Sequence, residues 1–233
     1  MNPTRIRLIL ALVFVLCTKA SYGGSFSIHT FTTESGTGLD SRLSYTHLVD
    51  TTIEEMTPDK LATINGVHFT QGLERCGTNY TVSGQAGGTY NAYDVNTGIY
   101  KLLYDYLFDD ESPTLLINLT GLTPGTAYDL RLYNGGIYPY IHKKYKVEVT
   151  NGGMTDSLID YDQLAYGMHY LQYEYTAESS ALAISITRTE NANATEIKYM
   201  LAGFTNSVVP AAVPEPSCLM CGIVIMTIMG RKR

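Results

Sequence analysis

Hydrophobic and polar residues alternate one by one in several stretches of the chain between residues 24 and 209. The clearest are residues 115–120, 128–133, 144–150, 171–176 and 182–187. Because successive side chains of a strand point to opposite faces, such a stretch buries one face and exposes the other. Glycine-rich turns lie between or beside these stretches, at Thr123-Pro124-Gly125, Asn134-Gly135-Gly136 and Asn151-Gly152-Gly153. The pattern predicts an all-β fold, an antiparallel β-sandwich.

One segment has the period of a helix instead. Apolar residues recur at positions i, i+3, i+4, i+7 and i+8 between Ile99 and Leu107, which places them on one helical face. Asn96 or Thr97 can cap the first turn, and the run from Asp109 to Pro113 ends the helix. We therefore expect one short helix that closes an end of the sandwich.

The composition agrees with a packed domain that is rich in strands. Hydrophobic residues make up 45% of the 233 residues and charged residues 16%, which excludes a disordered, solvated chain. Nineteen tyrosines, 21 glycines and no tryptophan favour strands and turns over helical bundles.

The formal net charge of −6 is unevenly distributed. Six of the 16 basic residues lie in the first 23 and the last three residues, and neither segment contains Asp or Glu. The remainder has ten basic and 22 acidic residues, a formal charge of −12. An acidic body repels phosphate backbones, so we expect no nucleic-acid partner.

The N-terminus has the features of a secretory signal peptide, which we assign to residues 1–23. Arg5 and Arg7 precede the apolar run of residues 8–16, which is too short to span a bilayer. Small residues then permit cleavage after Ala20 or after Gly23. The pattern predicts that the protein is exported.

The C-terminus contains three parts in order, which we assign to residues 210–233. The motif Pro214-Glu215-Pro216 is followed by an apolar run, Cys218–Gly230, and by the basic tail Arg231, Lys232 and Arg233. This order resembles the PEP-CTERM sorting signal of exopolysaccharide-producing Gram-negative bacteria.

The resemblance implies a role for each part of that segment. The motif would be recognised by a processing enzyme, exosortase, and the apolar run would hold the chain transiently in the inner membrane as a transmembrane helix. The tail would stay in the cytoplasm, as basic residues flanking a span generally do. Release to the cell surface or the extracellular matrix would follow.

The body, residues 24–209, is long enough for one complete core and is expected to form a single domain. Cys76 is its only cysteine, so we expect no internal disulfide. The run Leu119–Leu130 resembles the tyrosine-bearing corner of fibronectin type III modules. Together with Ile64–Phe69 and Leu201–Asn206, it resembles more closely the exported jelly-roll domains related to galactose-binding-like and carbohydrate-binding modules. This resemblance implies a jelly-roll-like sandwich.

No catalytic pattern stands out in the sequence. The five histidines lack the spacing of metal ligands, and there is no nucleophile elbow or phosphate-binding loop. We therefore expect a non-enzymatic protein without a cofactor, with a polysaccharide hydrolase as an alternative. A second possibility concerns metal binding, because Asp156, Asp160 and Asp162 supply oxygen ligands that could hold a structural Ca²⁺.

Tyrosines in turns are the remaining candidates for binding. Tyr138 and Tyr140 flank Pro139 in a glycine-rich loop, where rigid rings can stack on the apolar face of a sugar. Tyr173 and Tyr175 lie in an alternating stretch and are interpreted as core residues. The sequence thus predicts an exported surface or matrix protein, with a glycan-binding module as the main alternative.

Overall fold

The structure is a computed structural model of the whole chain. It describes residues 23–51, 61–71, 79–83, 85–89, 97–108, 114–135, 144–162, 165–189, 199 and 201–211. The predicted leader up to residue 22, Cys76, the loop with Tyr138 and Tyr140, the Pro214-Glu215-Pro216 motif and the tail Arg231, Lys232 and Arg233 lie outside these residues. The assigned boundaries of the leader, body and sorting segment stay predictions.

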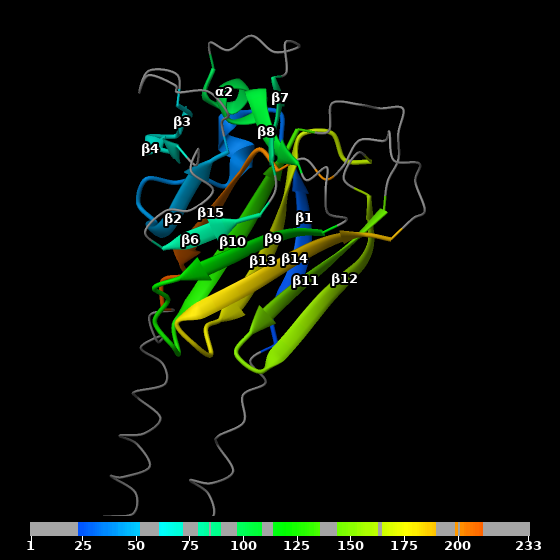
Figure 1. The fold of residues 1–233 in the computed structure, drawn as a ribbon. Coiled ribbons are helices and arrows are strands. Elements are labelled where there is room, and N and C mark those ends of the chain that lie inside the picture. The colour runs from blue at the N-terminus through cyan, green and yellow to red at the C-terminus, as the bar shows by residue number, and fades with distance from the viewer. Residues whose placement is uncertain are drawn as a thin grey trace, which may run out of the picture.

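Two sheets pack face to face (Figure 1). The six-stranded sheet has the order β1 (Ser25–Thr30), β13 (His169–Thr176), β10 (Ala127–Asn134), β15 (Gly203–Val208), β2 (Ser44–Asp50) and β5 (Thr70–Gln71). The five-stranded sheet has the order β12 (Met154–Asp162), β11 (Lys144–Asn151), β14 (Ala181–Arg188), β9 (Thr114–Thr120) and β6 (Tyr80–Val82). All pairings are antiparallel except that of β2 with β5. The predicted all-β antiparallel sandwich is confirmed.

The remaining elements are short. They are the 3-10 helix η1 (Glu34–Thr37), the helix α2 (Gly98–Tyr104), and the strand pairs β3 (Thr63–Ile64) with β4 (Val67–His68) and β7 (Gln85–Thr89) with β8 (Asp105–Phe108). None of the helices in the described ranges has the length and apolar character needed to cross a membrane.

The five alternating stretches of the sequence are the strands β9, β10, β11, β13 and β14. In β9, Leu115, Ile117 and Leu119 are buried between the sheets. Leu116, which alternates with them, is 45% exposed on the other face. The same alternation in the opposing sheet supplies Leu130, Leu132 and Phe204, so apolar side chains from both inner faces form the central core. Tyr173 and Tyr175 are buried in this core, as predicted.

The helix forms where it was expected but is shorter. The Thr97 hydroxyl accepts a hydrogen bond from the backbone N–H of Tyr100 (3.5 Å), so Thr97, one of the two predicted caps, caps the helix. The helix ends at Tyr104, however, and Tyr106 and Leu107 belong to β8, so the predicted extension to Leu107 is wrong. These residues form a strand because β8 pairs with β7. The local apolar pattern contains no information about this pairing.

The helix packs over the upper part of the outer face of the six-stranded sheet (Figure 1). There it contributes to a second core cluster, composed of Phe31, Leu39, Ala62, Ile64, Val67, Phe69, Ile99, Leu102, Leu103, Tyr133, Tyr170 and Ala202. A methyl group at Gly203 would lie 2.7 Å from Leu102, so glycine lets the helix approach the sheet closely. This cluster covers part of the outer face, and polar residues of β1, β13 and β10 lie beside it.

The corner that resembles a fibronectin type III module has the expected hydrogen bond. The Tyr128 side chain is buried, and its hydroxyl accepts the backbone N–H of Thr123 at 3.0 Å. Gly125 turns the chain with a φ of +81°, in the left-handed region that favours glycine. The turn thereby fixes the entry of β10, the strand that carries the central residues of the candidate site.

Candidate functional site

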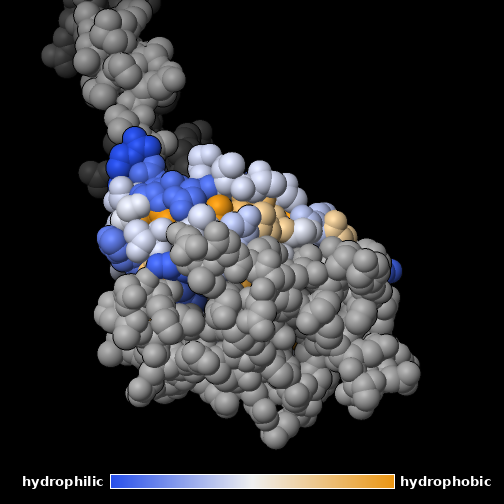
Figure 2. Space-filling model, turned by 90° about the horizontal axis from the view of Figure 1, so that it is seen from above, coloured by the Kyte–Doolittle hydropathy of each residue, from blue (hydrophilic) through white to orange (hydrophobic). Residues whose placement is uncertain are grey.

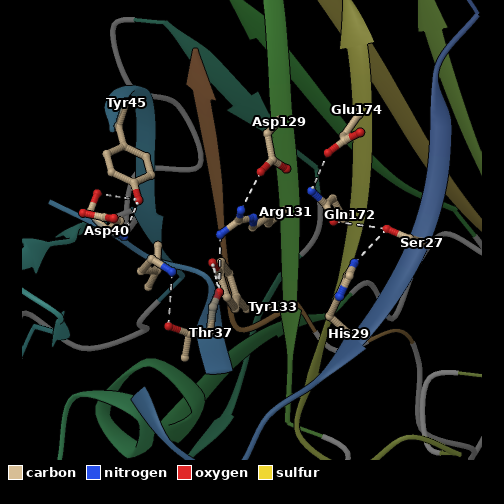
Figure 3. A network of polar contacts seen from close by, with 11 residues as sticks. Ser27, His29, Thr37, Asp40, Tyr45, Asp129, Arg131, Tyr133, Gln172 and Glu174 are labelled. Atoms are coloured by element: carbon tan, nitrogen blue, oxygen red, sulfur yellow. Dashed lines mark hydrogen bonds and ion pairs between the residues drawn. The ribbon is translucent and has the colours of Figure 1, made fainter. Parts of the chain in front are cut away.

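Six polar residues lie together on the outer face of the six-stranded sheet, beside the second core cluster. They come from three adjacent strands: Ser27 and His29 from β1, Gln172 and Glu174 from β13, and Asp129 and Arg131 from β10 (Figure 3). We call these six residues the polar face. The residues between them in each strand, such as Leu130 and Tyr173, point into the central core. Strand alternation therefore holds the polar side chains on a rigid support.

A buried ion pair lies at the centre of the polar face. Arg131 Nη2 donates to Asp129 Oδ2 at 2.6 Å, and the two side chains are only 11% and 9% exposed. Burial lowers the pKa of Arg131, but the nearby Tyr133 and Asp129 outweigh this and raise the pKa above its ordinary value. Within the described residues, Asp129 Oδ1 and Arg131 Nε are buried without a hydrogen-bond partner. The pair thus retains unused capacity for hydrogen bonds.

The loop before β2 encloses one side of this ion pair. Thr37 O accepts hydrogen bonds from Arg131 Nη1 (3.5 Å) and from the Tyr133 hydroxyl (3.2 Å). Gly38 has a φ of +70°, and a methyl group there would lie 2.4 Å from the Arg131 guanidinium. The loop requires glycine at this position for both reasons, conformation and space.

The Tyr170 ring packs against two residues of the polar face, Arg131 and His29. The Arg131 guanidinium lies 5.1 Å from the centroid of the Tyr170 ring, and the His29 ring stacks on it at 5.0 Å with an interplanar angle of 15°. A cation over an aromatic face and a stacked ring both restrict side-chain motion. Arg131 and His29 are therefore held in defined positions.

A chain of hydrogen bonds links the other four residues (Figure 3). The Ser27 hydroxyl donates to Gln172 Oε1 at 3.1 Å, and Gln172 Nε2 donates to Glu174 Oε1 at 3.1 Å. Because the single Ser27 proton is used for Gln172, His29 Nε2 must carry the proton in its 2.9 Å contact with the Ser27 oxygen. Ser27, His29 and Glu174 are also exposed, so this chain presents oriented donors and acceptors to solvent.

Two carboxylates face each other in the polar face. Asp129 on β10 is the direct cross-strand partner of Glu174 on β13. Side chains at such positions have Cβ atoms about 5 Å apart, and like charges there are destabilising. Arg131 and Gln172, which bond the two carboxylates, offset this repulsion. The local charge of the face is negative, like that of the body.

The three candidate calcium ligands do not converge. Asp156, Asp160 and Asp162 lie along the edge strand β12, where four residues span about 13 Å, whereas calcium ligands lie about 2.3–2.6 Å from the ion. Asp156 Oδ2 instead accepts hydrogen bonds from Gly24 N (2.7 Å) and the Tyr173 hydroxyl (2.6 Å). Among the residues that the structure describes, no group of three or more His, Cys, Asp or Glu side chains could hold a metal ion.

Most of the tyrosine side chains that the structure describes are core residues. The buried ones include Tyr133, Tyr145, Tyr161 and Tyr170, whereas the Tyr166 side chain is 41% exposed. Seen from the end that carries α2, the described surface is mostly hydrophilic, with small apolar areas (Figure 2). Tyr138 and Tyr140 belong to the part of the chain that is not described, so their role stays a prediction.

The polar face itself was not predicted as a site. Asp129, Arg131, Gln172 and Glu174 are polar positions of two predicted alternating stretches, whereas Ser27 and His29 lie outside the stretches named in the sequence analysis. The signal that could have singled them out is a charged pair at positions i and i+2, on one face of a strand. Its significance depends on β1, which lies next to β13 although the two strands are more than 130 residues apart.

No protein-family model matches the chain, and no curated protein matches its sequence. Solved structures match in fold. The plant receptor-like kinase ANX2 superposes with a TM-score of 0.51 and 10% identity, covering 72% of this chain and 49% of that chain. The ANXUR2 extracellular domain from Arabidopsis thaliana gives 0.50 and 9%, with the same coverage of 72% and 49%. The chain thus spans about half the length of these plant proteins.

A β-glucuronidase from Bacteroides uniformis also superposes, with a TM-score of 0.42 and 12% identity over 62% of this chain and 16% of that chain. A score of this size supports no argument about this protein. The two plant structures, at identities of 10% and below, show that the sandwich fold is shared and nothing further.

Proposed function

We propose that this protein is an exported, non-enzymatic surface or matrix protein that binds glycans through the polar face. The observation that carries the binding proposal is the set of exposed, oriented donors and acceptors of Ser27, His29 and Glu174, next to the buried Asp129–Arg131 pair. A sugar hydroxyl can donate to the Glu174 carboxylate and can both donate to and accept from neutral hydroxyl groups such as that of Ser27. Sites of this kind often place a few fixed polar groups on a rigid support.

The exposed members of the polar face extend this site across the sheet. Ser27, His29 and Glu174 add oriented donors and acceptors on neighbouring strands. The spacing of adjacent strands, about 4.8 Å, is close to the spacing of hydroxyl groups across one sugar ring. Tyr138 and Tyr140 are proposed as a further glycan contact. An extracellular location agrees with this role, since the fold is also found in a plant extracellular domain.

Export is proposed from the two ends of the chain. The leader predicts secretion, and the Pro214-Glu215-Pro216 motif with its apolar run and basic tail predicts transient retention in the inner membrane followed by exosortase processing. Calcium is not part of the proposal, because Asp156 is already engaged by Gly24 and Tyr173.

Processing at both ends is the first testable consequence. Intact-mass measurement of the protein released from the producing cell should show a chain that lacks the leader, residues 1–23 or 1–20, and the tail Arg231–Arg233. Replacing Pro214, Glu215 and Pro216 together with Ala should leave the tail attached and the protein in the membrane fraction. Recovery of the complete chain from the cytoplasm would contradict the export proposal.

Glycan binding is tested by removing the exposed ends of the polar face. The double variant Ser27→Ala/Glu174→Gln should weaken retention on the bound polysaccharide about tenfold, because one charge-assisted and one neutral hydrogen bond are lost. Its melting temperature should stay close to that of the parent, since both side chains are exposed.

The matched control carries the same chemical changes on the other sheet. Ser157→Ala/Glu148→Gln alters two residues that are cross-strand partners on the outer face of the five-stranded sheet. The control should be retained like the parent protein. Equal retention of both double variants on every polysaccharide would exclude the polar face as the binding site.

One observation favours a hydrolase as the alternative function. Asp129 and Glu174 are opposite one another, and retaining glycosidases use two carboxyl groups about 5–5.5 Å apart. The salt bridge to Arg131 occupies Asp129 Oδ2, and Gln172 bonds Glu174, which suits binding better than proton transfer. Release of reducing ends that is abolished by Glu174→Gln would replace the binding proposal with hydrolysis.

A further inference from the structure

We infer that the leader is removed between Gly23 and Gly24, and that the new α-ammonium group of Gly24 forms an ion pair with the Asp156 carboxylate. This inference rests on the proposed export. It selects one of the two cleavage positions that the sequence permits, after Ala20 or after Gly23. It also assigns a role to Asp156, which the polar face does not use.

The backbone nitrogen of Gly24 already contacts Asp156 directly. Gly24 N donates to Asp156 Oδ2 at 2.7 Å, and the Tyr173 hydroxyl donates to the same oxygen at 2.6 Å. The contact joins the start of β1 in one sheet to the edge strand β12 in the other, 132 residues away (Figure 1). Both the nitrogen and the carboxylate are partly buried. One carboxylate oxygen thus binds two donors at the rim of the sandwich.

Gly24 fits this position because it has no side chain. A methyl group there would lie 2.2 Å from Cζ and 2.4 Å from the hydroxyl oxygen of Tyr173. The Tyr173 ring belongs to the central core and is fixed by its contact with Phe26 at 4.7 Å. Any other residue would therefore push its nitrogen away from Asp156 or displace the ring.

Hydrolysis of the Gly23–Gly24 bond changes this contact. A signal peptidase adds one water across the peptide bond: the water oxygen becomes part of the Gly23 carboxylate, and both water protons end on the former peptide nitrogen, which becomes an ammonium group. An amide nitrogen has one N–H donor and no net charge, whereas an ammonium has three donors and a full positive charge. It can keep the bond to Asp156 Oδ2 and donate a second to the Tyr173 oxygen.

Cleavage after Ala20 would not produce this ion pair. The charge would lie three residues upstream, at Ser21, and Gly24 would keep its amide nitrogen. The amide bond to Asp156 has one charged partner, whereas an ammonium makes both partners charged and adds their Coulombic attraction. Removal of the leader at Gly23 therefore stabilises the junction between the two sheets, and the mature chain gains stability that its precursor lacks.

The direct test is N-terminal sequencing of the exported protein. The expected first residue is Gly24. A first residue of Ser21 would overturn this inference while leaving the proposed export intact. A chain that still begins with Met1 would overturn both, so the two failures are distinguishable.

A second experiment tests the ion pair itself. Asp156→Asn keeps an oxygen that accepts from Gly24 and Tyr173 but removes the charge, so the exported protein should melt about 3 °C lower, as expected for loss of a partly buried ion pair of about 1 kcal/mol. The control is Asp160→Asn on the same strand. Asp160 is exposed, and asparagine tolerates its φ of +59°, so this variant should melt like the parent.

A double-variant experiment measures whether the Asp156 charge and cleavage at Gly23 stabilise the protein through the same ion pair. Gly23→Leu blocks cleavage at Gly23 and directs it to Ala20, and this exported variant should also melt about 3 °C lower. Combining Gly23→Leu with Asp156→Asn should cause no further loss, because both changes remove the same ion pair. Additive losses would show that the ion pair does not form and would overturn the inference.

Discussion

Arg131→Met is expected to lower the free energy of unfolding by about 3 to 5 kcal/mol, because it leaves the Asp129 carboxylate buried without its positive partner. The Asp129 side chain is only 9% exposed, and Glu174 on the neighbouring strand adds a like charge directly opposite. The change also removes the guanidinium from the Tyr170 ring and from Thr37 O. Urea denaturation, with the midpoint and slope fitted separately, measures the loss.

A second ion pair in the protein provides the matched control. Lys146 and Glu148 on β11 have the same i, i+2 spacing and a distance of 2.7 Å, but their side chains are 38% and 32% exposed. Lys146→Met should therefore cost less than about 1 kcal/mol. The same substitution at two ion pairs of equal spacing isolates the effect of burial.

Removing both charges of the buried pair should restore much of the stability. Asp129→Leu/Arg131→Met leaves no uncompensated charge, and well-packed apolar replacements of buried ion pairs are often neutral or stabilising. The double variant should also lose glycan retention, since it removes the centre of the polar face. Equal losses for Arg131→Met and Lys146→Met would contradict the assignment of Asp129 and Arg131 as a buried pair. A stable double variant that still binds glycan would contradict the proposed site.

Local patterns in the sequence were sufficient for the strands of the central core. Strands β9, β10, β11, β13 and β14 each bury one face against the opposite sheet, and this produces the clean alternation that was recognised. The turn at Gly125 and the cap at Thr97 follow from equally local chemistry.

Pairing between distant strands was not available from such patterns. β15 lies in the middle of its sheet and is buried along most of its length. Three of its buried residues, Thr205, Asn206 and Ser207, are polar, so its sequence does not indicate a buried strand. Tyr106 and Leu107 have the spacing of a helix but belong to β8, which pairs with β7. The polar face has the same origin, since it exists only where β1, β13 and β10 are adjacent.

Acid should destabilise the protein through a buried histidine, His169. Its Nδ1 donates to Gly167 O at 2.7 Å, because a carbonyl oxygen can only accept. Its Nε2 therefore accepts a hydrogen bond from the Tyr161 hydroxyl, which is itself buried and also accepts from Asn134 Nδ2 at 3.3 Å. Both ring nitrogens are thus used by the neutral form of the histidine.

Protonation of His169 is unfavourable in the folded state. Burial lowers its pKa to about 4, although the Gly167 carbonyl and Asp162 act in the opposite direction. In the unfolded chain a histidine titrates near its ordinary value of 6.5. Between these two values the unfolded state binds one more proton than the folded state. Stability is therefore fully present above pH 6.5 and falls as the pH decreases toward 4, by about 3 kcal/mol in total.

Replacing His169 with Gln should flatten this dependence. The glutamine does not titrate, so the free energy of unfolding measured by urea at pH 4.5 and 7 should differ less in the variant than in the parent, by about 2 to 3 kcal/mol. The comparison uses the difference between two pH values, so a uniform loss of stability in the variant does not affect it. Burial also lowers the pKa of His47, so part of the dependence persists in the variant. His29→Gln, an exposed histidine of the polar face, is the control and should keep the full dependence of the parent. If His169→Gln showed the same loss at low pH as the parent, His169 would not be the group that makes the fold sensitive to acid.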